Sequence, residues 1–194
     1  MKRALFTIIV LLFATELFSQ NIEEFYSTST RINRTGMMVL GGWAISNMAY
    51  GAYGNWKFDD ERKYFGQMNM MWNLVNAGIA GFALYQFHNT DISLLSPEQM
   101  VNNHTKTQNL YLINAGLDIL YMAGGFYMIH ASKNNEKHQF RLKGYGQSVI
   151  LQGGFLFAFD LVMYAIQRNH IGNFDLPVKT LAISPYGLSL GFTF

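Results

Sequence analysis

Val75-Asn76-Ala77-Gly78-Ile79 lies within a long apolar segment, and its form (apolar, any residue, small, glycine, apolar) occurs four times in the chain. The other copies are residues 39–43, 113–117 and 151–155. The shared glycines are Gly42, Gly78, Gly116 and Gly154, so the steps are 36, 38 and 38 residues. A period of this size predicts one helix and its connection, repeated four times. Small residues in apolar segments are typical of helices that pack closely in lipid, so we interpret these glycines as helix-packing positions.

The composition favours a membrane protein with one domain. Of the 194 residues, 50% are hydrophobic and 13% are charged, whereas soluble domains contain about 25% charged residues. A net charge of +2, scattered along the chain, argues against a nucleic-acid partner. Because cysteine is absent, disulfides, thiol catalysis and thiolate metal sites are excluded.

Four segments have the length of a membrane-spanning helix, which needs about 20 residues. They are residues 36–54, 68–88, 108–131 and 145–168. The fold prediction is therefore an all-α membrane protein, with a four-helix transmembrane bundle over residues 36–170. Each segment contains Asn, Gln or Asp, so a soluble helical bundle is an alternative. Charged residues gather in the connections, however, whereas a soluble helix needs a charged outer face.

Residues 1–19 have the pattern of a secretory signal peptide. Lys2 and Arg3 precede an apolar core of residues 4–14, and cleavage is expected near Ser19. This core is shorter than a spanning helix, although an uncleaved anchor is the alternative. Residues 20–35 would then form an extracytoplasmic N-terminal segment.

The connections predict the orientation. Residues 55–67 contain three lysines and arginines and residues 132–144 contain four, whereas residues 89–107 contain only Lys106. Because positive connections remain in the cytoplasm, the first and third connections should lie inside. We therefore expect a multi-pass cell-membrane protein with both termini extracytoplasmic. Arg31, Arg34, Arg168 and Lys179 on the expected outer side weaken this bias.

The repeat also has a second level. Residues 42–53 align with residues 116–127, and six of these twelve positions are identical. Segments one and three are thus the closest pair. This predicts two similar helical hairpins in the same orientation. Convergence on small and apolar residues in lipid is the other explanation.

The C-terminal residues 171–194 are predicted to form a short extended tail. In residues 186–194, bulky apolar residues alternate with small or polar ones, as in a half-exposed strand. A strand ending in Phe194 resembles the closing strand of outer-membrane barrels. An outer-membrane barrel of about eight strands is therefore a further alternative, in conflict with segments twice the barrel-strand length of about 10 residues.

Polar side chains at helical spacing form a candidate binding cluster. Asn69, Asn73 and Asn76 share one face of segment two, because they are spaced by four and three residues. The proposed cluster comprises Asn47, Asn73, Asn76, Asn114, Asp118, Gln152 and Asp160. One interpretation is a set of amide bonds that fix helix register. The other is a mid-bundle pathway or site for a small polar ligand.

Asp118 and Asp160 are the sharpest candidates within this cluster. An ionised carboxylate near the bilayer centre costs several kcal/mol, and no lysine or arginine lies in the interior of the segments to pair with it, Arg168 being the last residue of the fourth. Either residue should therefore be protonated or hydrogen-bonded, and either could serve as a proton or cation site.

The motifs of common enzymes are absent from the sequence. There is no phosphate-binding loop, no GxSxG and no HExxH, and the five histidines lie at segment ends or in connections. We therefore expect no enzyme activity, no cofactor and no metal.

Three features carry a family resemblance: a short signal ending in Phe18-Ser19-Gln20, the run at residues 68–76, and the apolar C-terminal strand. The pattern resembles uncharacterised small four-helix membrane proteins of Bacteroidota-type bacteria. This resemblance implies no known activity and no assigned residues.

The functional expectation is a non-enzymatic integral membrane protein, either a scaffold or an accessory subunit. Its expected partners are the lipid bilayer and a second copy or another membrane protein. The alternative is a transporter or channel-like protein that binds a proton, cation or small polar solute at the Asn/Asp cluster.

Overall fold

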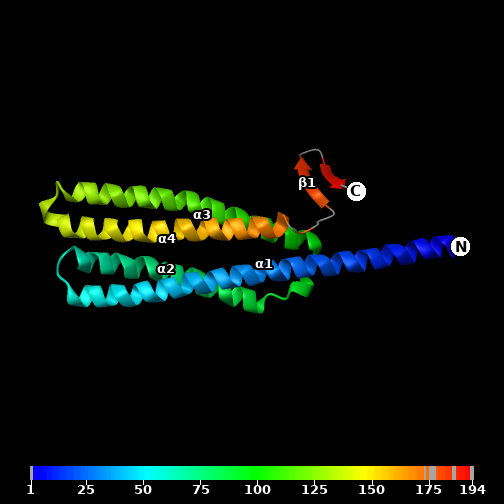
Figure 1. Ribbon diagram of the computed structural model, residues 1–194, viewed down its shortest axis with the longest axis horizontal. Coiled ribbons are helices and arrows are strands. Elements are labelled where there is room, and N and C mark those ends of the chain that lie inside the picture. Colours follow the sequence, from blue (N-terminus) through cyan, green and yellow to red (C-terminus); the bar gives the residue numbers. More distant parts are fainter. Residues whose placement is uncertain (1, 173, 175–177, 185–186, 193–194) are drawn as a thin grey trace.

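Four long helices dominate the fold (Figure 1). The computed structural model describes residues 2–172, 174, 178–184 and 187–192, and the side chains of residues 22–172 and 174. The helices are α1 (Lys2–Lys57), α2 (Glu61–Asn89), α3 (Pro97–Ser132) and α4 (Gln139–Gly172). Two single-turn 3-10 helices lie in the connections, η1 (Ile92–Leu94) and η2 (Glu136–His138). The predicted four-helix bundle is confirmed, and the barrel alternative is wrong because the described residues before 173 are helical apart from short connections.

Local capping explains where two of the helices begin. The Asp60 side chain accepts a hydrogen bond from the Arg62 backbone N–H and caps α2. The Ser96 side chain accepts from the Gln99 N–H, while the Gln99 side chain accepts from the Ser96 N–H, and Pro97 follows the cap. This reciprocal capping box satisfies two backbone donors at the start of α3.

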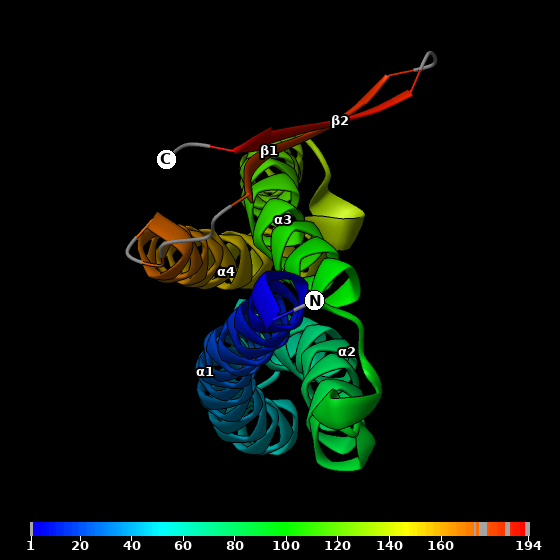
Figure 2. The same ribbon diagram turned by 90° about the vertical axis from the view of Figure 1, so that its right-hand side faces the viewer.

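The helices form two hairpins, α1–α2 and α3–α4, that pack side by side (Figures 1 and 2). The main contact between the hairpins is the contact of α2 with α4. An apolar cluster of Met37, Leu40, Ala80, Tyr111 and Met163 joins all four helices. The two hairpins therefore share one core.

The repeated glycines do not mark the places where these helices meet, which corrects the sequence interpretation. A Cβ atom added at Gly42, Gly78 or Gly116 would meet nothing within 4 Å, and at Gly154 it would make only ordinary contact with Met122 Sδ at 3.9 Å. The first three glycines are exposed on the surface of the bundle. The glycine repeat therefore predicted the four helices correctly, but it did not predict which face of each helix packs against the neighbouring helices.

Other glycines allow the close approaches. A Cβ on Gly51 would lie 2.5 Å from the Gly66 carbonyl oxygen, and one on Gly125 would lie 2.8 Å from the Gly146 carbonyl oxygen. Gly51 and Gly125 occupy equivalent positions in the alignment of residues 42–53 with 116–127. Each hairpin is thus closed by a glycine pair, and Gly144 packs in the same way against the backbone of α2 at Glu61 and Phe65.

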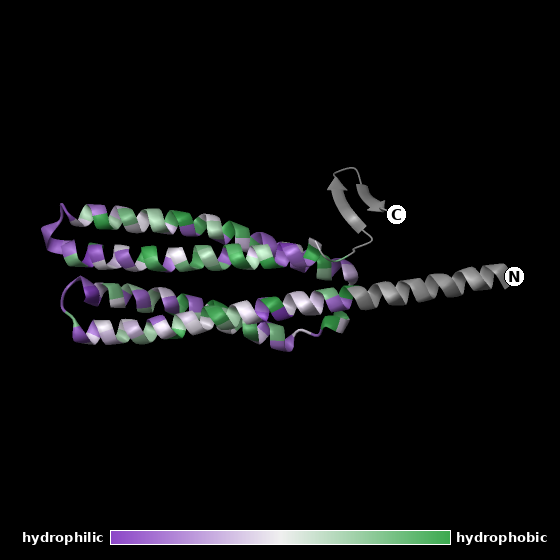
Figure 3. Ribbon diagram, viewed as in Figure 1, coloured by the Kyte–Doolittle hydropathy of each residue, from purple (hydrophilic) through white to green (hydrophobic). Residues whose placement is uncertain are grey.

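The bundle buries many polar side chains and exposes many apolar ones. Ile45 is 68% exposed and Leu120 is 66% exposed, whereas Asn69 and Gln152 are fully buried. Hydrophobic residues occupy much of the middle of α3 and α4, and hydrophilic residues gather near their ends (Figure 3). This surface is more apolar than that of a soluble bundle, and polar side chains share the interior with the apolar core cluster.

Two of the described helical stretches are long and apolar enough to cross a membrane: α3, and the stretch from Glu136 to Gly172 that contains α4. In the most apolar 18 residues of each stretch, only 17% and 28% respectively are buried against the rest of the chain. On this criterion, two of the four predicted spans are supported.

The two ends differ in part from the predicted divisions. Ile22, Phe25 and Ser29 are already buried, so helix packing begins before residue 36. The predicted cleavage near Ser19 stays a prediction, because the side chains before Ile22 lie outside the described residues. At the other end, β1 (Val178–Ser184) and β2 (Gly187–Phe192) pair as an antiparallel hairpin, so the tail contains a second strand besides the predicted one.

Candidate functional site

Four members of the predicted cluster belong to a continuous hydrogen-bonded network that joins three helices. Asn69 Nδ2 on α2 donates to Asn47 Oδ1 on α1 at 2.9 Å. Gln152 Nε2 on α4 donates to Asn69 Oδ1 and, at 3.3 Å, to Asn47 Oδ1. Trp43 Nε1 donates to Gln152 Oε1 at 2.8 Å. We call these four residues with Asn73, Asn76 and Ser148 the inner network.

The remaining members extend this network along α2. Asn73 Nδ2 donates to the Asn69 carbonyl oxygen at 2.8 Å, and Asn76 Nδ2 donates to Asn73 Oδ1 at 3.4 Å. Ser148 Oγ donates to Asn69 Oδ1 at 3.4 Å. The structure thus brings together Asn47, Asn73, Asn76 and Gln152 of the predicted cluster, with Asn69 at its centre.

Asn114 does not belong to this network. It is exposed on α3, whereas Tyr111, Ala115 and Asp118 are buried. Asn114 lies about 60° around the helix from Tyr111, on the edge of the buried face. Its assignment to the interior was therefore wrong.

Asp118 and Asp160 form a separate carboxyl pair between α3 and α4. Their side chains are 3% and 5% exposed and lie close enough to influence each other. Two ionised carboxylates side by side in the bundle interior would repel each other, so we expect the pair to share one proton. Asp118 Oδ2 is buried without a hydrogen-bond partner. The pair is therefore the one predicted feature with unused binding capacity.

A second polar network, missed by the sequence reasoning, lies at the opposite end of the bundle from η2. Ser29 Oγ on α1 contacts His104 Nδ1 on α3 at 2.8 Å and donates to Gln167 Oε1 on α4 at 3.1 Å. Asn33 Oδ1 accepts from Gln167 Nε2 at 2.8 Å and from Tyr111 OH at 3.0 Å. We call these five residues the outer network. The seven-residue steps from His104 to Tyr111 and Asp118, and from Asp160 to Gln167, are the signal that could have identified it.

His104 is held neutral within the outer network. It is 1% exposed, and burial together with the neighbouring His170 lowers the pKa of His104 from 6.5 to about 4. Ser29 Oγ and His104 Nδ1 share a hydrogen bond whose donor depends on the His104 tautomer. His104 Nε2 is buried without a hydrogen-bond partner.

His104 predicts a loss of stability in mild acid. Its pKa is lower in the folded chain than its ordinary value of 6.5, so the unfolded chain binds a proton that the folded chain does not bind. Stability should fall as the pH decreases from about 6.5 to about 4, by up to about 3 kcal/mol. Thermal unfolding of the full chain in detergent, followed across this range, measures the loss. The His104→Asn variant should show a clearly smaller pH dependence, and an equal dependence in both chains would contradict the assignment.

This arrangement suits positioning better than covalent chemistry. Ser29 is 1% exposed, so its hydroxyl cannot reach a substrate from outside. Within the part of the chain whose side chains the structure describes, no group of three or more His, Cys, Asp or Glu side chains could hold a metal ion. What the interior provides is interhelical hydrogen bonds and one pair of neighbouring carboxyl groups.

The comparisons with known proteins identify a family without an assigned activity. The sequence model described as "Family of unknown function (DUF6992)" matches residues 39–161, more than half of the chain. No curated protein and no solved structure matches the chain. The matched region includes the inner network and the carboxyl pair, while Ser29 and Gln167 of the outer network lie outside it.

Proposed function

Given that the chain belongs to the family of unknown function DUF6992, we propose that it is a non-enzymatic integral membrane protein, a scaffold or accessory subunit. All four helices cross the bilayer in this proposal, and a cleaved signal of residues 1–19 delivers the N-terminus to the outside. The main support for this proposal is the distribution of side chains in the bundle, with amides buried and many large apolar side chains exposed.

The exposed apolar surface supports the membrane location. Many Leu, Ile, Val, Phe and Met side chains of α1 to α4 are more than one-third exposed. Exposure of so much apolar surface to water is unfavourable, whereas the hydrocarbon chains of a bilayer would cover it. Residues 55–67 and 132–144, at the end of the bundle that contains η2, hold seven of the fourteen lysines and arginines, which supports a cytoplasmic location for this end.

The inner network supports a scaffold rather than a polar pore. The amides of Asn47, Asn69 and Gln152 bond to one another and to Trp43. Such bonds fix the register of helices in lipid. Gly42, Gly78 and Gly116 are exposed, and small residues on a lipid-facing surface allow a neighbouring helix to approach. A second copy or another membrane protein is the expected partner.

The carboxyl pair favours a second candidate function, which is proton or cation binding in a transporter or channel-like protein. Asp118 Oδ2 lies in the bundle interior without a hydrogen-bond partner. A proton or small cation that entered between α3 and α4 would find two carboxyl groups there. Rare acids inside a membrane bundle usually have a role of this kind.

Comparing the wild type with Asp118→Asn tests both functions. A scaffold should fractionate with membranes, resist carbonate extraction and retain its co-purifying partners in the variant. A transporter reconstituted in vesicles should show a proton or sodium flux that the variant reduces by at least about tenfold. Recovery of the wild type in the carbonate-soluble fraction would refute the membrane location itself. If Asp118→Asn lost its partners but kept the proton or sodium flux of the wild type, the transporter hypothesis would be refuted.

A further inference from the structure

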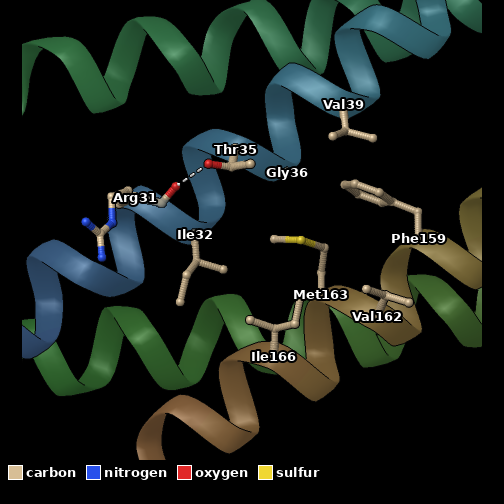
Figure 4. A pocket seen from close by; sticks show the side chains of 9 residues that line it. All are labelled: Arg31, Ile32, Thr35, Gly36, Val39, Phe159, Val162, Met163 and Ile166. Carbon is tan, nitrogen blue, oxygen red and sulfur yellow. Dashed lines mark hydrogen bonds between the residues drawn. The ribbon is translucent and has the colours of Figure 1, made fainter.

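An apolar groove runs between α1 and α4 near the end of the bundle that contains the outer network (Figure 4). Its volume is about 400 Å³. Three positions of α1, Ile32, Gly36 and Val39, face three of α4, Phe159, Met163 and Ile166. Val39 is 53% exposed and Ile166 is 43% exposed, so the groove opens on the outer surface.

Gly36 allows the Met163 side chain to lie directly against α1 within the groove. A Cβ atom at this position would lie 2.6 Å from Met163 Cε and 2.7 Å from Met163 Sδ. Beyond Val39 and Phe159, α1 and α4 meet where Trp43 stacks on Phe155, with ring centroids 3.9 Å apart. At the other end they meet through the Ser29–Gln167 hydrogen bonds. The groove is thus a bounded slot rather than a continuous gap between the helices.

Positive charge marks one end of this slot. Arg31 lies at the end opposite Val39 and Phe159 in Figure 4. Arg31 is the arginine that lines the slot; Arg34 lies one turn toward Val39 on α1 and Arg168 two residues beyond Ile166 on α4, and both are outside the lining. All three arginines are exposed, and none makes an ion pair with the described carboxylates. Arg168 is oriented by a 2.9 Å hydrogen bond from its Nη1 to Tyr164 OH.

We propose that the groove binds one acyl chain of an anionic phospholipid, with the lipid phosphate at Arg31. The inference rests on the membrane location proposed above. From Arg31 to Val39 the slot follows eight residues of α1, about 12 Å, which suits an extended hydrocarbon chain entering from the outer headgroup layer. Guanidinium groups bind phosphate through paired hydrogen bonds, so the charged end complements an anionic headgroup. If a second copy of the chain occupied the groove instead, it would have to place an acidic side chain next to Arg31 to give the same charge complementarity.

Native mass spectrometry of the full chain in detergent tests the proposal, with phosphatidylglycerol and phosphatidylcholine added separately. We expect one phosphatidylglycerol to be retained per chain, and phosphatidylcholine of the same acyl length to bind about tenfold more weakly. Arg31→Gln should remove this preference, whereas Lys133→Gln at the other end of the bundle should keep it. Glycerol phosphate, which has the headgroup chemistry without the acyl chain, should not compete.

A matched pair of glycine variants tests the slot itself. Gly36→Leu should abolish retention of both lipids, because the new side chain occupies the groove. Gly42→Leu on the same helix should leave retention unchanged, because its side chain meets open space. If Gly36→Leu fails to fold, the lipid preference of the Arg31→Gln variant, whose substitution is on the surface, still tests the proposal.

Two results would overturn the groove proposal. The first is equal retention of the two lipids by the wild type and Arg31→Gln. The second is a lipid-independent dimer that Gly36→Leu dissociates, which would make a second copy the occupant. Either result from a chain that resists carbonate extraction would leave the membrane proposal intact, whereas a carbonate-soluble chain would remove the basis for both.

Discussion

Replacing Gly66 by leucine is expected to cost the α1–α2 hairpin about 3 kcal/mol or more of stability. A Cβ atom at Gly66 would lie 2.7 Å from the Gly51 carbonyl oxygen and 3.2 Å from the Asn55 N–H nitrogen. Both are backbone atoms of α1, so the clash can be relieved only by separating the two helices. Overpacking of this kind costs about 1–3 kcal/mol even where side chains can yield, and here they cannot. Unfolding of the full chain by denaturing detergent, followed by circular dichroism, measures the effect.

Gly78→Leu is the matched control on the same helix. A Cβ at Gly78 meets nothing within 4 Å, so the substitution should change stability by no more than about 0.5 kcal/mol. If the two variants lost equal stability, the repeated glycine would be as tightly packed as Gly66. That result would restore the interpretation of the repeat that the structure corrects.

The second large effect is expected for Gln152→Leu. Leucine has nearly the volume of glutamine, but the change leaves Trp43 Nε1 without its acceptor and removes the donor shared by Asn47 Oδ1 and Asn69 Oδ1. A buried polar group left unpaired costs about 1–3 kcal/mol, and interhelical hydrogen bonds in lipid are at the lower end. We expect a loss of about 2 kcal/mol in the same unfolding assay, with a shift in Trp43 fluorescence.

Asn114→Leu controls for loss of an amide as such. Asn114 is exposed on α3, so this variant should match the wild type or exceed it in stability. A loss equal to that of Gln152→Leu would show that Asn114 has an interior role after all. Unchanged stability of Gln152→Leu would mean that the inner network does not hold the helices together.

Much of the fold was predictable because it depends on local properties of the chain. Long apolar segments between charged connections predict helices wherever they lie, since each helix satisfies its own backbone hydrogen bonds. The face that carries Asn69, Asn73 and Asn76 was recognisable because helical spacing alone places them together. Their burial then follows, because an unpaired amide is costly in an apolar environment.

The outer network was not predictable from such local patterns. Ser29 lies 75 residues from His104 and 138 residues from Gln167 in the sequence. His104 lies in the predicted connection of residues 89–107, and no local pattern links it to Ser29 or Gln167. Only the approach of α1, α3 and α4 in space makes them one site. The same holds for the groove, whose two walls come from opposite ends of the chain.

The sequence by itself determined that four helices form two hairpins with polar residues buried between them, because helix formation and polar burial depend on spacing and composition. Tertiary structure decided which side of each helix faces its neighbour. Gly42 and Gly51 are nine residues apart on one helix, and only Gly51 lies against Gly66. The reason is geometric: at about 100° per residue, nine residues place Gly42 and Gly51 on opposite faces of α1, so the rotation of the helix about its axis decides which of them reaches the contact. That rotation is set by the packing of all four helices together.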